Sequence, residues 1–449
     1  MKGINKKLWA IAFPLLLNML ISQVQMIIDR AFLGQIDVGY MSALGNVSAP
    51  LWTTISILFA LSTGGTILMS QALGADDKPR ASLIAHAILK YNSAVALLLF
   101  FFWLFAARGI FMLMGVEGDI LSYALRYVRY LIPIFLIMGI NSAGASILQS
   151  AGYTRPILIS GALRSGLNIL LDWILIFGRF GFPEMGIEGA ALATSIAELT
   201  GTVLLFILIL GSRKLPFRIS IKKILSSPFR LYKEVSAKGI PTAGEELLWN
   251  LGNLGLIRIL NAISPLATGI YTIIFTVDII PALIIISIAQ GVTALAGRNT
   301  GAGDVEGAKR VGLIGQLNSW GIAALFLVLF FLFPRFILGI FTSDTAIIES
   351  SVILLLVAAV NFFPRSVNLI MGSAIRGFGD TKWMLKTQIL GTVYILSMGS
   401  LAVFVFDLGL PGVFLTILSD ETIRGVINYF RFRRGPDLTP KAVQLEETA

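Results

Sequence analysis

The sequence predicts an all-α integral membrane protein with twelve transmembrane helices, arranged as two pseudo-two-fold-related six-helix lobes around a central cavity. Of its 449 residues, 56% are hydrophobic and 13% are charged, which is about half the charged share of soluble domains. The mean hydropathy is +0.84 over the whole chain. So few charges cannot cover a water-soluble surface of this size, so the composition indicates a polytopic membrane protein.

Twelve segments each offer the roughly 20 mostly apolar residues that a helix needs to cross the hydrocarbon layer. They cover residues 8–34, 41–73, 82–107, 120–150, 156–178, 187–211, 239–262, 266–297, 311–334, 349–375, 383–406 and 409–430. The first segment is too long for a signal-peptide core and has no small-residue cleavage site, so we count it as a span.

Lys and Arg are distributed unequally between the two sets of connections. The N-terminus, the loops after even-numbered spans and the C-terminus hold 24 of the 35, with Lys386 at the start of the eleventh span counted among them, whereas the opposite loops hold only Arg108, Arg179 and Arg335. By the positive-inside rule, this predicts a multi-pass protein of the plasma or inner membrane with both termini in the cytoplasm. The net charge of +10 is scattered over short loops, which suits anionic lipids and does not resemble a nucleic-acid-binding stripe.

The two halves of the chain resemble each other at an offset of 227 residues. Pro14 matches Pro241, and Asn141 matches Asn368. Near the end the offset becomes 223, where Glu198 meets Glu421. Because each half has an even number of spans, the copies share one orientation, so we expect them to be related by an axis along the membrane normal.

This duplication divides the chain into four parts. We expect an N-terminal lobe at residues 1–212, a basic cytoplasmic linker at 213–238, a C-terminal lobe at 239–434 and a cytoplasmic tail at 435–449. Isoleucines and a leucine among the lysines of the linker fit an amphipathic segment on the inner membrane surface, and a flexible connection is the alternative.

Ionisable residues at membrane depth are costly, by at least about 2.5 kcal/mol, so each one requires an explanation. In the N-terminal half, two spans carry polar residues at intervals of three or four, which places them on one face of each helix. These residues are Asn18, Ser22, Gln25 and Asp29 in the first span, and Arg164, Asn168 and Asp172 in the fifth. Thr194 lies in a run of small residues in the sixth span, where helices can approach closely.

At a rise of about 1.5 Å per residue, Asp29, Asp172 and Thr194 all fall in the outer half of the N-terminal lobe, so one site can contain them. Two carboxylates, an amide and a hydroxyl suit a sodium ion, which favours oxygen ligands. They suit equally a proton shared between the carboxylates. The alternative for Asp29 is a place at the outer interface. Arg164 is about 12 Å from Asp172 along the helix, too far for a direct pair.

The C-terminal half lacks this set, because at the same offset Leu256 stands for Asp29 and Gly399 for Asp172. Its own candidates for coupling or substrate binding are Glu245, Glu246, Arg258 and Asp278. We expect the two glutamates near the cytoplasmic interface, and for Asp278 we favour a structural pair with Arg258 or Arg365. We expect His86 to be solvated at the membrane surface.

Several classes of site are excluded by composition. With one His and no Cys, the chain has no thiolate metal site and no disulfide framework, and any His-based triad would require His86. No phosphate-binding G-x-x-x-x-G-K-[ST] motif occurs. We therefore expect no enzymatic activity and no cofactor or metal, with only a sodium ion or a proton as the coupling ion.

The order and spacing of several motifs resemble the multidrug and toxic compound extrusion (MATE) transporters over nearly the whole chain. The motifs are Pro14 with Asp29–Gly34, Gln71–Ala75, Gln149–Pro156, Asn168–Gly178, Gly186–Thr194 and Gly377–Lys382. The resemblance implies that Asp29, Asn168, Asp172 and Thr194 match an N-lobe cation site. Some members use a glutamate of the seventh span, but here Glu245 and Glu246 stand closer to Pro241 than expected. Many relatives have proline where this chain has Trp173.

The resemblance implies efflux of lipophilic organic cations by antiport with sodium or protons, through alternating access. We expect an apolar cavity lined by aromatic and Met residues, and a change in the first span at Pro14 or near Gly34 when the ion binds. The partners are then small organic cations and membrane lipids, with no nucleic acid, and the protein is a monomer. A flippase for lipids or lipid-linked oligosaccharides is the alternative, supported by Arg164, Arg258 and Arg365. A channel or membrane enzyme is a third interpretation.

Overall fold

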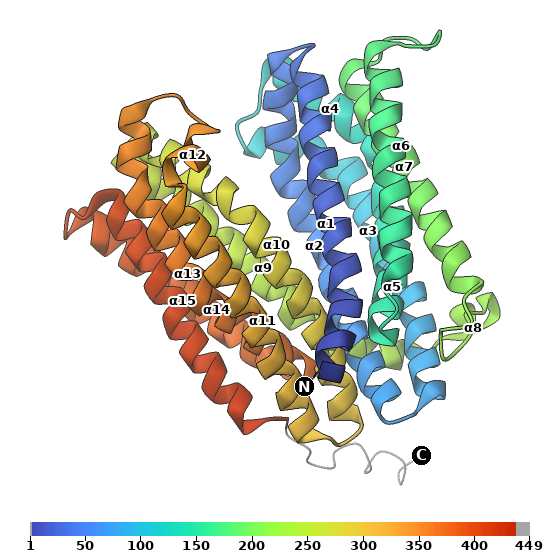
Figure 1. Cartoon of the computed structure of the whole chain (residues 1–449). Helices are drawn as coiled ribbons and strands as arrows, with labels where there is room; N and C mark the ends of the chain where they lie inside the picture. Colours follow the sequence, from blue (N-terminus) through green and yellow to red (C-terminus); the bar gives the residue numbers. More distant parts are fainter. Residues whose placement is uncertain (1, 437–449) are drawn as a thin grey trace.

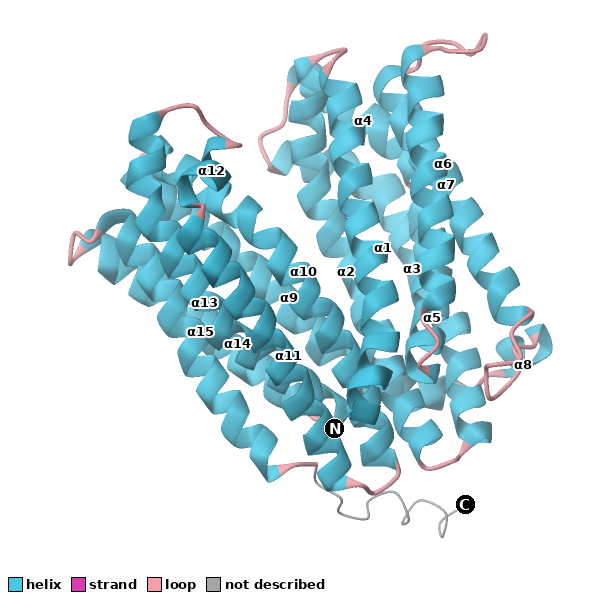
Figure 2. Cartoon of the chain, in the orientation of Figure 1, coloured by secondary structure: helices cyan, strands magenta, loops and turns pink. Residues whose placement is uncertain are grey.

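The computed structural model describes residues 2–436, and every regular element among them is a helix (Figure 2). Of the predicted tail, residues 437–449 lie outside the described part. The helices are α1 (Lys2–Gly34), α2 (Val38–Gly74), α3 (Lys78–Leu113), α4 (Gly118–Leu131), α5 (Ile134–Ala151), α6 (Arg155–Phe177), α7 (Gly186–Leu210), α8 (Ile221–Ser226), α9 (Phe229–Ile263), α10 (Pro265–Gly301), α11 (Val305–Leu332), α12 (Pro334–Gly339), α13 (Thr345–Gly377), α14 (Thr381–Phe404) and α15 (Gly409–Arg434).

The predicted all-α membrane fold with twelve transmembrane helices is confirmed, although only ten of the described helices are identified as spans by length and hydropathy. Within residues 2–436, ten helices are long and apolar enough to cross a membrane. The other two, α9 and α15, are 35 and 26 residues long, but they carry charges such as Glu245 and Arg424, which lower their hydropathy. The fourth span is divided at Pro133 into α4 and α5, because a proline cannot continue the hydrogen-bond ladder of a helix.

The internal repeat sets where the helices begin. The first residues of α2 and α10, Val38 and Pro265, are 227 positions apart, as are those of α3 and α11, Lys78 and Val305. The C-terminal ends of α2 and α10 also pack closely against each other, and each contributes a glycine to the contact. A Cβ atom on Gly74 would collide with the backbone of Arg298, and one on Gly301 would collide with the backbone of Gln71. Only glycine permits this approach, and both pairs obey the same offset.

The two lobes meet at one end of the molecule and diverge toward the other (Figure 1). α1 to α7 form one bundle and α9 to α15 form the other, and they meet at the end that holds the N-terminus. The hydrogen bonds that join them there include Trp9 Nε1 to Asn318 Oδ1 at 3.1 Å, Arg298 Nε to the Ser150 carbonyl at 2.9 Å, and Gln71 Nε2 to the Gly377 carbonyl at 2.9 Å.

The connection between the lobes is largely ordered against the N-terminal bundle. α9 begins at Phe229, ten residues before the predicted start of the seventh span, and the short helix α8 precedes it. The expectation of a solvated His86 is wrong. Its ring is fully buried beneath the connection, where Nε2 accepts from the Ser220 backbone N–H at 3.0 Å.

Candidate functional site

Three helices of the N-terminal bundle bring the predicted polar residues to one place. α1 supplies Gln25 and Asp29, α6 supplies Asn168 and Asp172, and α7 supplies Thr194. α6 packs against both α1 and α7, so the polar side chains of α6 lie next to those of the other two helices. The spacing of three or four residues on α1 and α6 therefore places these side chains opposite one another.

The side chains form one hydrogen-bonded group. The Asp29 and Asp172 carboxyl groups are close neighbours that interact electrostatically. With its amide nitrogen toward Asp29, Asn168 donates to both carboxylate oxygens at 3.2 Å, and its oxygen accepts from the Thr194 backbone N–H at 3.3 Å. Gln25 Nε2 lies 3.5 Å from Asp29 Oδ2, and its amide also contacts that of Asn168.

The group has an excess of negative charge and of hydrogen-bond acceptors. Asn168 and Asp172 are fully buried, and Asp172 Oδ1 has no hydrogen-bond partner among residues 2–436. Neither carboxylate forms an ion pair with a Lys or Arg in this part of the chain, where the nearby Arg164 pairs instead with Glu198 at 3.2 Å. A buried carboxylate without a cation is costly, so the arrangement chemically favours uptake of a cation or a proton.

The acidic group borders a large cavity between the lobes. The cavity has a volume of about 750 Å³ and is lined by α1, α2, α4 to α7, α9 and α10. Asp29 and Thr194 face it, whereas Asn168 and Asp172 lie behind them. Its bulky apolar lining includes Met19, Met26, Trp52, Phe59, Tyr127 and Met138.

The predicted candidates of the C-terminal lobe do not come together. Glu245 is 7% exposed and forms an ion pair with Arg376 of α13. Glu246 faces the inter-lobe cavity instead. Arg258 is exposed and lines neither this cavity nor the smaller one of the C-terminal lobe.

The expected direct pair of Asp278 with Arg258 or Arg365 is also absent. Asp278 and Arg365 line the same small cavity, of about 90 Å³, within the C-terminal lobe. Within residues 2–436, however, Asp278 forms no ion pair, and its buried Oδ1 has no hydrogen-bond partner. Asp278 and Arg365 therefore line one cavity without forming an ion pair with each other.

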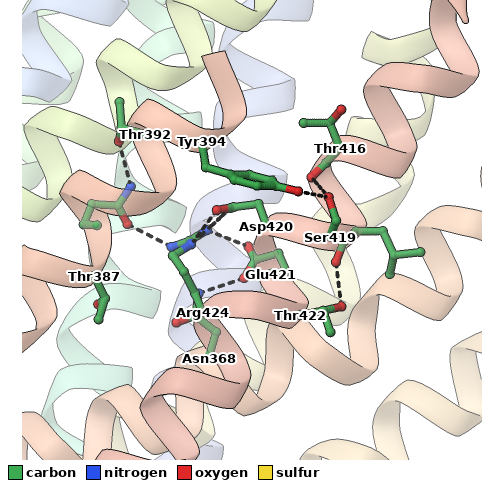
Figure 3. Close-up of polar contacts among 12 residues, drawn as sticks. Asn368, Thr387, Thr392, Tyr394, Thr416, Ser419, Asp420, Glu421, Thr422 and Arg424 are labelled. Atoms are coloured by element: carbon green, nitrogen blue, oxygen red, sulfur yellow. Dashed lines mark hydrogen bonds and ion pairs between the residues drawn. The ribbon is translucent and has the colours of Figure 1, made fainter. Parts of the chain in front are cut away.

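A second polar cluster, on α13 to α15, was not predicted (Figure 3). Arg424 pairs with Asp420, with Nη2 to Oδ2 at 2.5 Å, and contacts Glu421 Oε1 at 3.4 Å. Asn368 Nδ2 donates to Glu421 Oε2 at 2.7 Å, and Arg424 Nη1 donates to Gln388 Oε1 at 3.0 Å. The sequence offered one indication of this cluster: the last predicted span contains three charged residues in the stretch 420–424.

Comparison with known proteins identifies relatives that are similar to this chain over nearly their whole length. The sequence model of the MatE family matches residues 14–174 and again residues 241–400. A protein named as the uncharacterized transporter YisQ of Bacillus subtilis is 28% identical, over 95% of this chain and 93% of its own length. The probable multidrug resistance protein NorM of Thermotoga maritima is 29% identical, over 96% of this chain and 93% of its own.

Solved structures agree in fold. A multidrug resistance MATE family transporter of the MOP superfamily, in an outward-facing conformation, superposes with a TM-score of 0.89 at 20% identity, covering 96% of this chain and 95% of that one. A MOP superfamily transporter from Pyrococcus furiosus, described as having a binding pocket of reverse polarity, gives a TM-score of 0.88 at the same identity and coverage.

Proposed function

This chain belongs to the MATE family of membrane transporters, and on that premise we propose that it exports lipophilic organic cations in exchange for sodium ions or protons. The observation that supports the proposal is the acidic group on α1, α6 and α7, which has no ion pair to Asp29 or Asp172 within residues 2–436 and borders the inter-lobe cavity. The oxygens of Asp29, Asn168, Asp172 and Thr194 are the ligands that a sodium ion favours. A proton held between the two carboxylates would satisfy the same group.

The first helix is suited to connect ion binding with movement of the lobes. α1 carries Asp29 near one end and Trp9 near the other, and Trp9 bonds Asn318 of the C-terminal lobe. The two positions are about 30 Å apart along the helix. An ion that draws Asp29 toward α6 therefore acts on a helix that also holds the lobes together. Differential affinity of the ion for the two arrangements then drives the exchange.

The cavity suits a lipophilic cation better than a lipid-linked phosphate. Its charged lining consists of Asp29, Glu198 and Glu246 against Arg30 and Arg164, an excess of one negative charge. Arg164 is already paired with Glu198. The other arginines that would favour a flippase, Arg258 and Arg365, do not line this cavity. Its aromatic and Met side chains provide surfaces for cation–π and apolar contacts.

The test is transport of a fluorescent cationic dye in proteoliposomes, with sodium and pH gradients imposed separately. We expect one of the two gradients to drive dye accumulation or release. Measurable translocation of a labelled lipid-linked sugar, with no dye transport under either gradient, would replace the exporter by the flippase.

The proposed orientation places both termini in the cytoplasm, because 24 of the 35 basic residues lie in the connections on that side. The chain has no cysteine, so single introduced cysteines report their side directly. In intact cells, an impermeant maleimide should label Glu184→Cys and leave Ser226→Cys unlabelled. The opposite pattern would reverse the orientation and, with it, the direction of transport.

A further inference from the structure

The connection between α7 and α9 carries a positive charge that the rest of the described chain leaves unneutralised. From residue 213 to residue 233 it has seven basic residues and no acidic one: Arg213, Lys214, Arg218, Lys222, Lys223, Arg230 and Lys233. Within residues 2–436 none of them forms an ion pair. The next acidic residue, Glu234, pairs with Arg80 of α3 at 3.2 Å. This segment, residues 213–233, is called the basic connection below.

The basic connection is fixed to the N-terminal lobe through its backbone. Lys90 Nζ donates to the carbonyls of Leu225 at 2.8 Å and Ser227 at 3.1 Å. Tyr91 OH donates to the Ser227 carbonyl at 3.0 Å, and the Ser220 N–H bonds His86. These four contacts come from one helix, α3, so the basic connection has a defined face turned toward the protein.

On that inner face, apolar side chains pack against the N-terminal lobe; they are Leu215, Phe217, Ile219 and Ile224. The outer face is also apolar, with Ile221 at 77%, Leu225 at 68% and Phe229 at 62% exposure. Lys222 and Lys223 are exposed between them. Exposed apolar side chains mixed with lysines are typical of a segment lying in the interface of a membrane.

The location favours a lipid over a soluble partner. α8 lies at the same end of the molecule as the first residues of α1, beside the ends of the apolar helices (Figure 1). Basic side chains at this level face the headgroups of the leaflet, and clusters of four to eight of them attract anionic lipids. A soluble polyanion would satisfy the lysines but would leave Ile221, Leu225 and Phe229 in water.

We propose that the basic connection is a binding site for anionic phospholipid headgroups, with Ile221, Leu225 and Phe229 inserted at the level of the acyl chains. The lipid then holds the connection against α3 while the two lobes move relative to each other. The proposal concerns binding at the membrane surface and does not depend on the transported substrate or on the coupling ion.

The test uses the full-length protein in a zwitterionic detergent and measures binding of phosphatidylglycerol and of phosphatidylcholine by native mass spectrometry. We expect phosphatidylglycerol to bind at least about tenfold more tightly, since each surface Lys or Arg contributes about fivefold. Lys222→Gln with Lys223→Gln should weaken phosphatidylglycerol binding by about 25-fold, which is about fivefold for each lysine. The control, Arg433→Gln with Arg434→Gln, makes the same charge change at the exposed end of α15 and should leave it within twofold.

A second variant separates a lipid from free phosphate. Ile221→Ser with Leu225→Ser keeps every charge and should weaken phosphatidylglycerol binding several-fold because the acyl contact is lost. Millimolar inorganic phosphate should not displace the lipid. Equal affinity for the two lipids, the same loss in the α15 control, or displacement by phosphate would overturn the proposal. Circular dichroism and gel filtration establish that each variant is folded.

Discussion

The two lobes have the same helical framework but differ in the surroundings of their main clusters of buried carboxylates. In the N-terminal lobe, Asp29 and Asp172 lie together among neutral amides and a hydroxyl, with no ion pair to either in residues 2–436. In the C-terminal lobe, Glu245 is paired with Arg376, and Arg424 pairs with both Asp420 and Glu421. The N-terminal lobe supplies a cation to Glu198, through Arg164, but none among residues 2–436 to Asp29 or Asp172.

This difference indicates a division of labour. A carboxylate with a fixed arginine is neutralised in every state of the protein, so its charge contributes to stability and does not respond to the ion gradient. A carboxylate without one must take a cation or proton from solution to stay in the membrane. The comparison therefore predicts that variants of the N-terminal cluster change coupling and that variants of the C-terminal pairs change stability.

The largest effect is expected on removal of one charge from the N-terminal cluster. Asp172→Asn keeps the size and much of the hydrogen bonding but leaves a single carboxylate, so ion binding and proton sharing are both lost. Gradient-driven dye efflux in proteoliposomes should fall at least about tenfold, and Asp29→Asn should behave similarly. The double variant should be little worse than either single one, because residues of one site are not additive.

The control for this prediction is the amount and stability of the protein in the membrane. Removing an uncompensated buried charge should leave both near the wild-type level or slightly higher. Efflux by either single variant at the wild-type rate, with unchanged ion dependence, would show that the two carboxylates do not form one coupling unit.

The sequence predicted the framework and the N-terminal cluster because both depend on regular spacing. An offset of 227 residues predicts helix starts such as Val38 and Pro265, and intervals of three or four residues predict a shared helix face. The Glu245–Arg376 pair escaped prediction because its members are 131 residues apart on helices with no local signal linking them. His86 was misplaced because hydropathy does not show that a connecting segment folds back over α3.

The next effect is on stability, and it is expected in the C-terminal lobe. Glu245→Gln leaves the Arg376 guanidinium without its partner, and breaking a buried ion pair from one side costs about 3–5 kcal/mol. The melting temperature of the purified protein should fall by several degrees. The neighbouring Glu246→Gln is the matched control, because Glu246 faces the cavity and forms no ion pair in the described chain. Equal melting of the two variants would contradict the prediction.

A smaller effect is expected from a neutral ligand of the N-terminal cluster. Thr194→Val removes one hydroxyl and keeps the shape, so the ion concentration for half-maximal efflux should rise about fivefold, the equivalent of one hydrogen bond of about 1 kcal/mol. The maximal rate should change little. Thr200→Val is the control, because Thr200 makes the same bond to the carbonyl four residues earlier on α7 but is not among the cavity-lining residues. A shift of equal size in both variants would assign the effect to the helix rather than to the site.

The smallest effect is expected at Asp278, which is also the sharpest test of the comparison. Asp278 Oδ1, like Asp172 Oδ1, is buried without a hydrogen-bond partner in the described chain. It differs in that Arg365 lines the same small cavity as a fixed positive charge, while the other acids of that lining, Asp420 and Glu421, pair with Arg424. Asp278→Asn should therefore keep efflux within about twofold and leave its ion dependence unchanged, as expected of a group whose charge is balanced locally. Arg365→Gln provides the reciprocal variant, and dye efflux at graded sodium and proton concentrations is the measurement. A loss of ion dependence in Asp278→Asn comparable to that of Asp172→Asn would show that an unpaired oxygen matters more than the nearby arginine, and both lobes would then contribute to coupling.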